Sequence, residues 1–149
     1  MNPITFYAYP AGTITGHGKS LVGHMFFSVT TGTVLGWAPR GGGQLNVKDD
    51  WGNINYPGVR SATFYVGDAT LGAIQGEINS WIGDTSGYCL LFKDCVSFVK
   101  AIIDVINQQA KLKGQTTIPD TWSKFPDSVI DKLINISQLP AFNGVKIGD

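Results

Sequence analysis

The residues of this chain with the clearest capacity for chemistry are one cysteine and one histidine. Cys95 follows Asp94 at the start of the strongest apolar periodicity of the second half, where a helix would present free backbone N–H groups. These groups and the helix dipole stabilise a thiolate, and they can hold the oxyanion of a tetrahedral intermediate. His24 lies 95 − 24 = 71 residues earlier, within an apolar run. Because the charge of Asp94 opposes a thiolate, His24 would supply most of the activation.

Each of these residues also has a purely structural interpretation. A free cysteine most often behaves as a small buried hydrophobe, and a lone histidine in an apolar run is usually a core residue with satisfied nitrogens. Cys89, in the apolar run 88–92, fits the structural interpretation better than Cys95. A Cys89–Cys95 disulfide can form in an oxidising compartment and would block the nucleophile. His17 lies between two glycines and is expected on an exposed loop.

The segment Gly18-Lys19-Ser20 is similar to the end of a phosphate-binding loop but does not complete the motif. The motif needs a glycine at position 13, which is Thr13, and a helix after the loop. An apolar, strand-like run follows instead, so a flexible glycine loop is the better interpretation.

Composition predicts one domain, spanning 1–149, with a substantial core: 43% of residues are hydrophobic and 15% are charged. Eleven basic and eleven acidic residues give a net charge of 0, which argues against a nucleic-acid binder with a broad basic face. Two cysteines and two histidines give no reason to propose a metal or another cofactor. No apolar run is long enough for membrane insertion, and the first residues do not form a signal peptide. We expect a soluble cytoplasmic product that a dedicated secretion machine could export.

The hydrophobic pattern predicts an α+β domain, with strands first and helices later. A long surface loop is expected at 38–60, and loops of that length are often functional. Strands are expected at 4–9, 21–30, 33–37, 62–66 and, as a short run, 88–92, and the second and third of these should form a hairpin. Helices are expected at 68–82, capped by Asp68, at 95–113, capped by Asp94, and at 127–136.

The order of four motifs resembles a known group of enzymes. The motifs are a strand carrying Gly23-His24, then Gly36-Trp37-Ala38-Pro39 with a glycine-rich loop, Tyr88-x-Leu90-Leu91, and Asp94-Cys95-Val96-x-Phe98-Val99. Over roughly 21–106, this order is similar to that of the circularly permuted papain-like cysteine hydrolases of the NlpC-like superfamily, in which histidine precedes cysteine. That group includes lecithin:retinol acyltransferase-like proteins and peptidoglycan amidase toxins delivered by type VI secretion.

The resemblance implies a papain-like core in permuted order, with an antiparallel sheet packed against helices. It implies that Cys95 is the nucleophile and His24 the general base that later becomes the acid. Tyr88 would lie near the oxyanion or serve packing, and Asp94 stands where relatives often have asparagine. Trp37, together with the long loop that follows it, could line a substrate groove, and the alternative is that its ring packs locally. Relatives orient the imidazole with a third polar residue; here a backbone carbonyl or a side chain could substitute, the candidates being Ser28, Asp49 and Asp50.

The expected function is therefore that of a cysteine peptidase or amidase that cleaves an amide bond in peptidoglycan peptides, as an antibacterial effector with a cognate immunity protein. An acyltransferase, thioesterase or deamidase could use the same pair of residues. A binding module without catalysis, with Cys95 buried and inert, is the remaining alternative.

Overall fold

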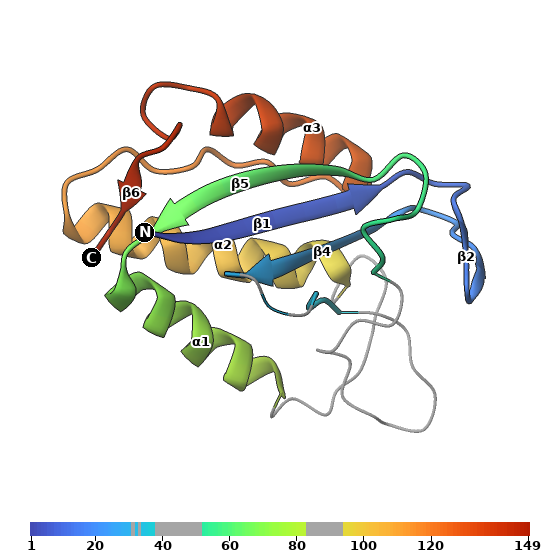
Figure 1. Ribbon diagram of the computed structural model, residues 1–149, viewed down its shortest axis with the longest axis horizontal. Helices are drawn as coiled ribbons and strands as arrows, with labels where there is room; N and C mark the ends of the chain where they lie inside the picture. The colour runs from blue at the N-terminus through green and yellow to red at the C-terminus, as the bar shows by residue number, and fades with distance from the viewer. Residues whose placement is uncertain (31, 33, 38–51, 83–93) are drawn as a thin grey trace.

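A computed structural model describes residues 1–30, 32, 34–37, 52–82 and 94–149 (Figure 1). This part of the chain contains a four-stranded sheet, a separate two-stranded ribbon and three helices. In chain order the elements are β1 (Asn2–Tyr9), β2 (Ile14–Thr15), β3 (Gly18–Lys19), β4 (His24–Val29), β5 (Arg60–Val66), α1 (Asp68–Ile82), α2 (Cys95–Leu112), α3 (Pro126–Ser137) and β6 (Lys146–Ile147). The expected α+β class is confirmed.

The sheet has the order β4-β1-β5-β6. The central strand β1 pairs antiparallel with both β4 and β5, so that Phe6 lies opposite Phe27 on one side and Ala62 on the other. The short strand β6 pairs parallel with β5. The sheet is therefore mixed, and the expectation of an antiparallel sheet was wrong at this edge. Strand β6 could not be predicted from the sequence, because two residues are too few to show a hydrophobic periodicity.

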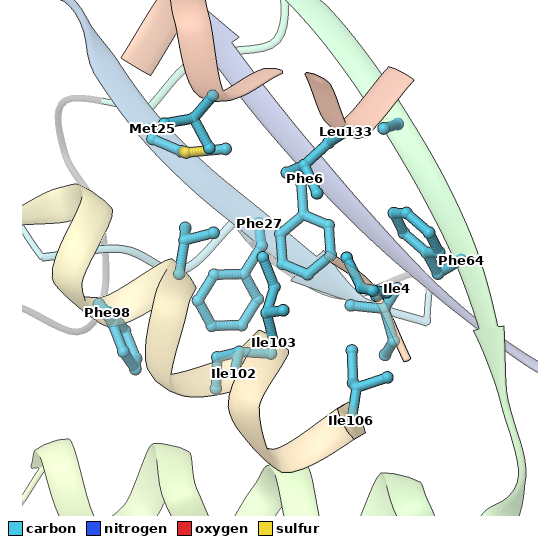
Figure 2. Close-up of a cluster of buried hydrophobic side chains, with 14 of the residues drawn as sticks. Ile4, Phe6, Met25, Phe27, Phe64, Phe98, Ile102, Ile103, Ile106 and Leu133 are labelled. Carbon is cyan, nitrogen blue, oxygen red and sulfur yellow. The ribbon is translucent and has the colours of Figure 1, made fainter. Parts of the chain in front are cut away.

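One face of the sheet carries the core. Alternate residues of β1 (Ile4, Phe6 and Ala8) join the main hydrophobic cluster, as their strand pleat requires. All three helices contribute to the same cluster, and Figure 2 shows Ile103 and Ile106 of α2 directed toward Phe6 and Ile4. Burying each such side chain stabilises the fold by about 1.5–3 kcal/mol. Helices α2 and α3 therefore cover this face of the sheet, and α1 packs against α2.

The last residues of the chain pack against the start of α1. The backbone N–H of Thr70 donates to the carbonyl oxygen of Asp149 at 2.6 Å, and the Thr70 hydroxyl donates to Ile147 O at 3.2 Å. Gly148 has a φ of +67°, and a Cβ there would lie 2.1 Å from the Thr70 Oγ1 atom. Only glycine fits this position without a shift of its neighbours.

Local pattern predicted the three helices well, with bounds that differ by one residue or less. Asp94 caps α2 as expected, whereas Asp68 is the first residue of α1 rather than the residue before it. The expected strand at 33–37 forms, within its described residues, a single bridge between Leu35 and Phe27. The expected strand at 88–92 and most of the loop at 38–60 lie outside the described residues. The ribbon β2–β3 was expected as a glycine loop.

Candidate active site

Cys95 is the first residue of α2, and a complete capping box holds this end of the helix. The Asp94 Oδ1 atom accepts hydrogen bonds from the backbone N–H and the hydroxyl of Ser97, each at 3.0 Å. In return, the backbone N–H of Asp94 donates to the Ser97 Oγ atom at 3.2 Å. This arrangement fixes the first turn, where backbone N–H groups point away from the helix and favour negative charge. The observed role of Asp94 is helix capping.

The Cys95 side chain lies inside the protein. Its residue is 3% exposed and belongs to the main hydrophobic cluster, and its thiol is free. The side chain thus has the helix N-terminus that favours a thiolate, together with apolar neighbours that oppose one. The proposed disulfide partner, Cys89, lies outside the described residues.

His24 is the first residue of β4, the edge strand next to β1. It is 4% exposed. Its ring stacks on Phe26, with centroids 5.7 Å apart and an interplanar angle of 19°, and contacts the Tyr9 ring at 5.7 Å. Gly23, just before it, has a φ of +85° and lies so close to the Tyr9 carbonyl that a Cβ would be 2.5 Å from the oxygen. The entry into β4 is therefore fixed by backbone packing.

Cys95 and His24 lie at the same end of the packing between α2 and β4. The two elements run in the same direction (Figure 1), and the Phe27 ring meets the Phe98 ring edge-on at 5.1 Å. His24 precedes Phe27 by three residues, and Cys95 precedes Phe98 by three. Three residues span about 10 Å in a strand and about 4.5 Å in a helix, so His24 starts about 5 Å beyond Cys95 along the shared direction.

The pleat of β4, however, directs the His24 side chain to the face of the sheet opposite the one that packs against α2 and Cys95. Met25 and Phe27 join the core cluster that includes Cys95, so they face α2. His24 stacks on Phe26, which in turn stacks on Tyr7 at 5.3 Å, on the other face of the sheet. The structure thus brings the starts of the two elements together and turns the imidazole away from the helix.

The other predicted site residues divide between core and undescribed positions. Trp37 is fully buried, and its ring packs edge-on against Trp81 at 4.9 Å and Phe98 at 6.3 Å. This is a core position in the described part of the chain, and the lining of a substrate groove by Trp37 stays a prediction. Tyr88, predicted near the oxyanion, lies outside the described residues.

Of the side chains proposed to orient the imidazole, the structure describes only Ser28. Ser28 is buried on the same face of β4 as His24, four residues further along the strand. Asp49 and Asp50 lie outside the described residues. His17 is exposed in the β2–β3 turn, where its backbone N–H donates to the Thr15 hydroxyl at 3.0 Å.

The strongest charge cluster lies away from Cys95, between β5 and α3. The Arg60 guanidinium donates to the carboxylates of Asp131 and Asp127, and these hydrogen bonds raise the pKa of Arg60 above its ordinary value. All three side chains are substantially exposed. The described residues contain no group of three or more histidine, cysteine or acidic side chains placed to hold a metal ion.

Sequence reasoning missed a groove beside α2. Its lining comes from α2 between Val96 and Asn107, from residues 118–122, and from Val129 of α3. The only local signal in the sequence was an aromatic residue, Trp122, within a polar connecting segment, and the structure leaves that side chain 54% exposed.

Comparison with protein-family models, with curated proteins and with solved structures finds no match for this chain. Within the described ranges, the helices lack the combination of length and hydropathy that crossing a bilayer requires.

Proposed function

We propose that this chain is a cysteine hydrolase that cleaves an amide bond, with Cys95 as nucleophile and His24 as general base and then acid. The motif order implies peptidoglycan peptides as the substrate and an antibacterial secreted effector, of permuted papain-like fold, as the setting. One observation carries the proposal: Cys95 is the first residue of a capped helix whose first turns pack on the strand that begins with His24.

The chemistry is acyl transfer in two steps. His24 takes the thiol proton, the sulfur attacks the carbonyl carbon, and N–H groups of the first turn of α2 hold the oxyanion. The intermediate collapses, the C–N bond breaks, and the protonated His24 gives its proton to the leaving amine. Water then attacks the Cys95 thioester, loses a proton to His24, and releases the carboxylic acid and the thiol.

This mechanism places one requirement on the fold. The His24 ring stacks on Phe26, on the face of β4 away from α2, and must approach the sulfur from beyond the end of the strand. Among the described strands, His24 has one neighbour, β1, because β4 lies at the edge of the sheet, and His24 is the first residue of β4. Catalysis therefore requires the His24 ring to move off the Phe26 ring and to rotate around the start of β4 toward the Cys95 sulfur.

A second candidate, a binding module without catalysis, is favoured by two specific observations. Cys95 is 3% exposed among apolar side chains, and the pleat turns His24 to the opposite face. The two candidates differ in whether the native thiol reacts.

The proposal is tested with purified peptidoglycan fragments and mass spectrometry of the products. We expect new amine termini from the wild-type protein and none from Cys95→Ala or His24→Ala. The control is the thermal unfolding of both variants, which should stay within about 3 °C of wild type if only chemistry is lost. Absence of cleavage by a folded wild-type sample, across peptide, ester and glutamine substrates, would favour the module.

A further inference from the structure

The groove beside α2 has the size of a site for one side chain. Its volume is about 280 Å³, just below the roughly 300–1,000 Å³ of pockets for whole small ligands. The segment that forms its outer wall is fixed to the helix by Asn107, whose amide donates to Ile118 O at 2.9 Å and accepts from Ile118 N at 2.7 Å. The groove therefore has a defined shape without a ligand.

A buried hydroxyl that has no hydrogen-bond partner among the described residues lines this groove. Thr121 is 6% exposed, and its hydroxyl makes no hydrogen bond to any residue that the structure describes. A buried polar group left unpaired costs about 1–3 kcal/mol, and most such groups in folded proteins are paired. A hydroxyl held at this cost beside a groove points to a ligand that completes its hydrogen bonding.

The residues on either side of Thr121 add negative charge and an aromatic face. The Asp120 Oδ1 atom accepts from the backbone N–H of Trp122 at 2.9 Å, and Asp120 enters no ion pair within the described part of the chain. The Trp122 ring is more than half exposed. Across the groove, Lys100 is already paired with Asp104 at 2.9 Å. The charged side chains of the lining therefore sum to 1 − 2 = −1.

We propose that this groove binds a primary ammonium group on an aliphatic stem, such as the lysine side chain of a peptide. An ammonium offers three hydrogen-bond donors and no acceptor. The groove supplies the matching acceptors, which are the Asp120 carboxylate, the Thr121 hydroxyl and the face of the Trp122 ring. Val99 and Ile103 of α2 provide an apolar wall for the stem.

The position of the groove connects it to the proposed chemistry. Its lining on α2 begins at Val96, the residue after Cys95. A lysine-type side chain held there would belong to the substrate whose amide bond Cys95 attacks. That assignment to a substrate rests on the proposed function, whereas binding of the ammonium does not.

The test measures binding to the Cys95→Ala protein, so that the result does not depend on hydrolysis. The probe is a blocked tripeptide, acetyl-Gly-Lys-Gly-amide, followed through the indole N–H signal of Trp122 in nuclear magnetic resonance spectra, with Trp122→Phe assigning the signal. We expect the same peptide with norleucine, which keeps the stem and lacks the ammonium, to bind about tenfold more weakly or worse. Equal binding of the two peptides, or binding of neither, would overturn the proposal.

Substitutions then test each partner of the ammonium. Asp120→Asn keeps the hydrogen bond to Trp122 and should weaken binding of the lysine peptide by about tenfold. Glu77→Gln removes one negative charge on α1, away from the groove, and should change binding by less than about twofold. Lys100→Met should tighten binding, because it frees Asp104; weaker binding in this variant would indicate an anionic ligand and overturn the proposal.

Thr121→Val separates a binding role from a structural one. Because the valine methyl replaces an unpaired hydroxyl, we expect the unfolding temperature to stay level or rise while lysine-peptide binding falls about threefold or more. A lower unfolding temperature with unchanged binding would show a structural hydroxyl and contradict the proposal. If the lysine peptide binds but no amide is cleaved, the hydrolase proposal fails and the ammonium site stands. If an amide is cleaved but the lysine peptide does not bind, the ammonium site fails and the hydrolase proposal stands.

Discussion

Removing the cap of α2 should destabilise the whole domain by an amount that its hydrogen bonds define. Asp94→Ala deletes an acceptor that serves both the backbone N–H and the hydroxyl of Ser97. Loss of an N-cap acceptor costs about 0.5–2 kcal/mol, and loss of a negative charge at a helix N-terminus costs a further 0.3–1 kcal/mol. Since Asp94 is only 5% exposed, the upper half of the summed range applies, about 2–3 kcal/mol.

The assay is urea unfolding followed by circular dichroism, with thermal unfolding as a second measurement. For a domain of this size, about 2–3 kcal/mol corresponds to a decrease of about 6–9 °C in the unfolding temperature. Asp94→Asn keeps the acceptor and should cost only the charge effect, about 0.3–1 kcal/mol. A free energy of unfolding for Asp94→Ala within about 0.5 kcal/mol of wild type, the variation of neutral surface changes, would refute the capping argument.

Three further substitutions test the packing and electrostatics of the fold. Gly148→Ala should lower the unfolding free energy by about 1–3 kcal/mol, because the added Cβ meets Thr70 Oγ1 and the φ of residue 148 is positive. The control is Gly114→Ala, which also has a positive φ but has open space around the added Cβ, and it should cost about 1 kcal/mol. Phe98→Ala, which removes a fully buried ring between Phe27 and Trp37, should cost about 3–5 kcal/mol in urea unfolding, and a cost below 1.5 would contradict the described core. Arg60→Met should cost at most about 1 kcal/mol and less in high salt, because the ion pairs are exposed. The pKa of Arg60 is raised in the folded state, so its contribution to stability is complete at every pH below its ordinary value in the unfolded chain. The cost of Arg60→Met should therefore be the same at pH 5 and pH 9, and a cost that differs between these two pH values would contradict this.

The helices could be predicted from sequence because their signals are local. The periodicity of α2 and its cap at Asp94 are both encoded within one continuous segment. Long-range geometry decides the predicted strand at 33–37, whose described residues form only the bridge between Leu35 and Phe27; Thr30, the residue after β4, adopts a φ of +59° that a regular strand does not have. Strand β6 depends on β5, about eighty residues earlier, which local reasoning does not reach.

The orientation of His24 shows a different limit of sequence reasoning. Alternation places His24 with Phe26 and opposite Phe27 in any strand, and the structure follows that rule. The sequence did not reveal which face would meet the helix, because both faces of β4 carry large apolar residues. The groove beside α2 was missed for a related reason, since it joins a helix face to a segment without periodicity.

The central claim, that His24 activates the Cys95 thiol in the folded protein, is tested most directly by the rate of its alkylation. Native protein is treated with iodoacetamide near pH 6, and peptide mapping by mass spectrometry follows Cys95 separately from Cys89. The account predicts that Cys95 reacts faster in the native protein than in urea, and that His24→Ala removes this difference while leaving the fold intact. A native Cys95 that reacts only on unfolding, at the same rate with or without His24, would contradict it.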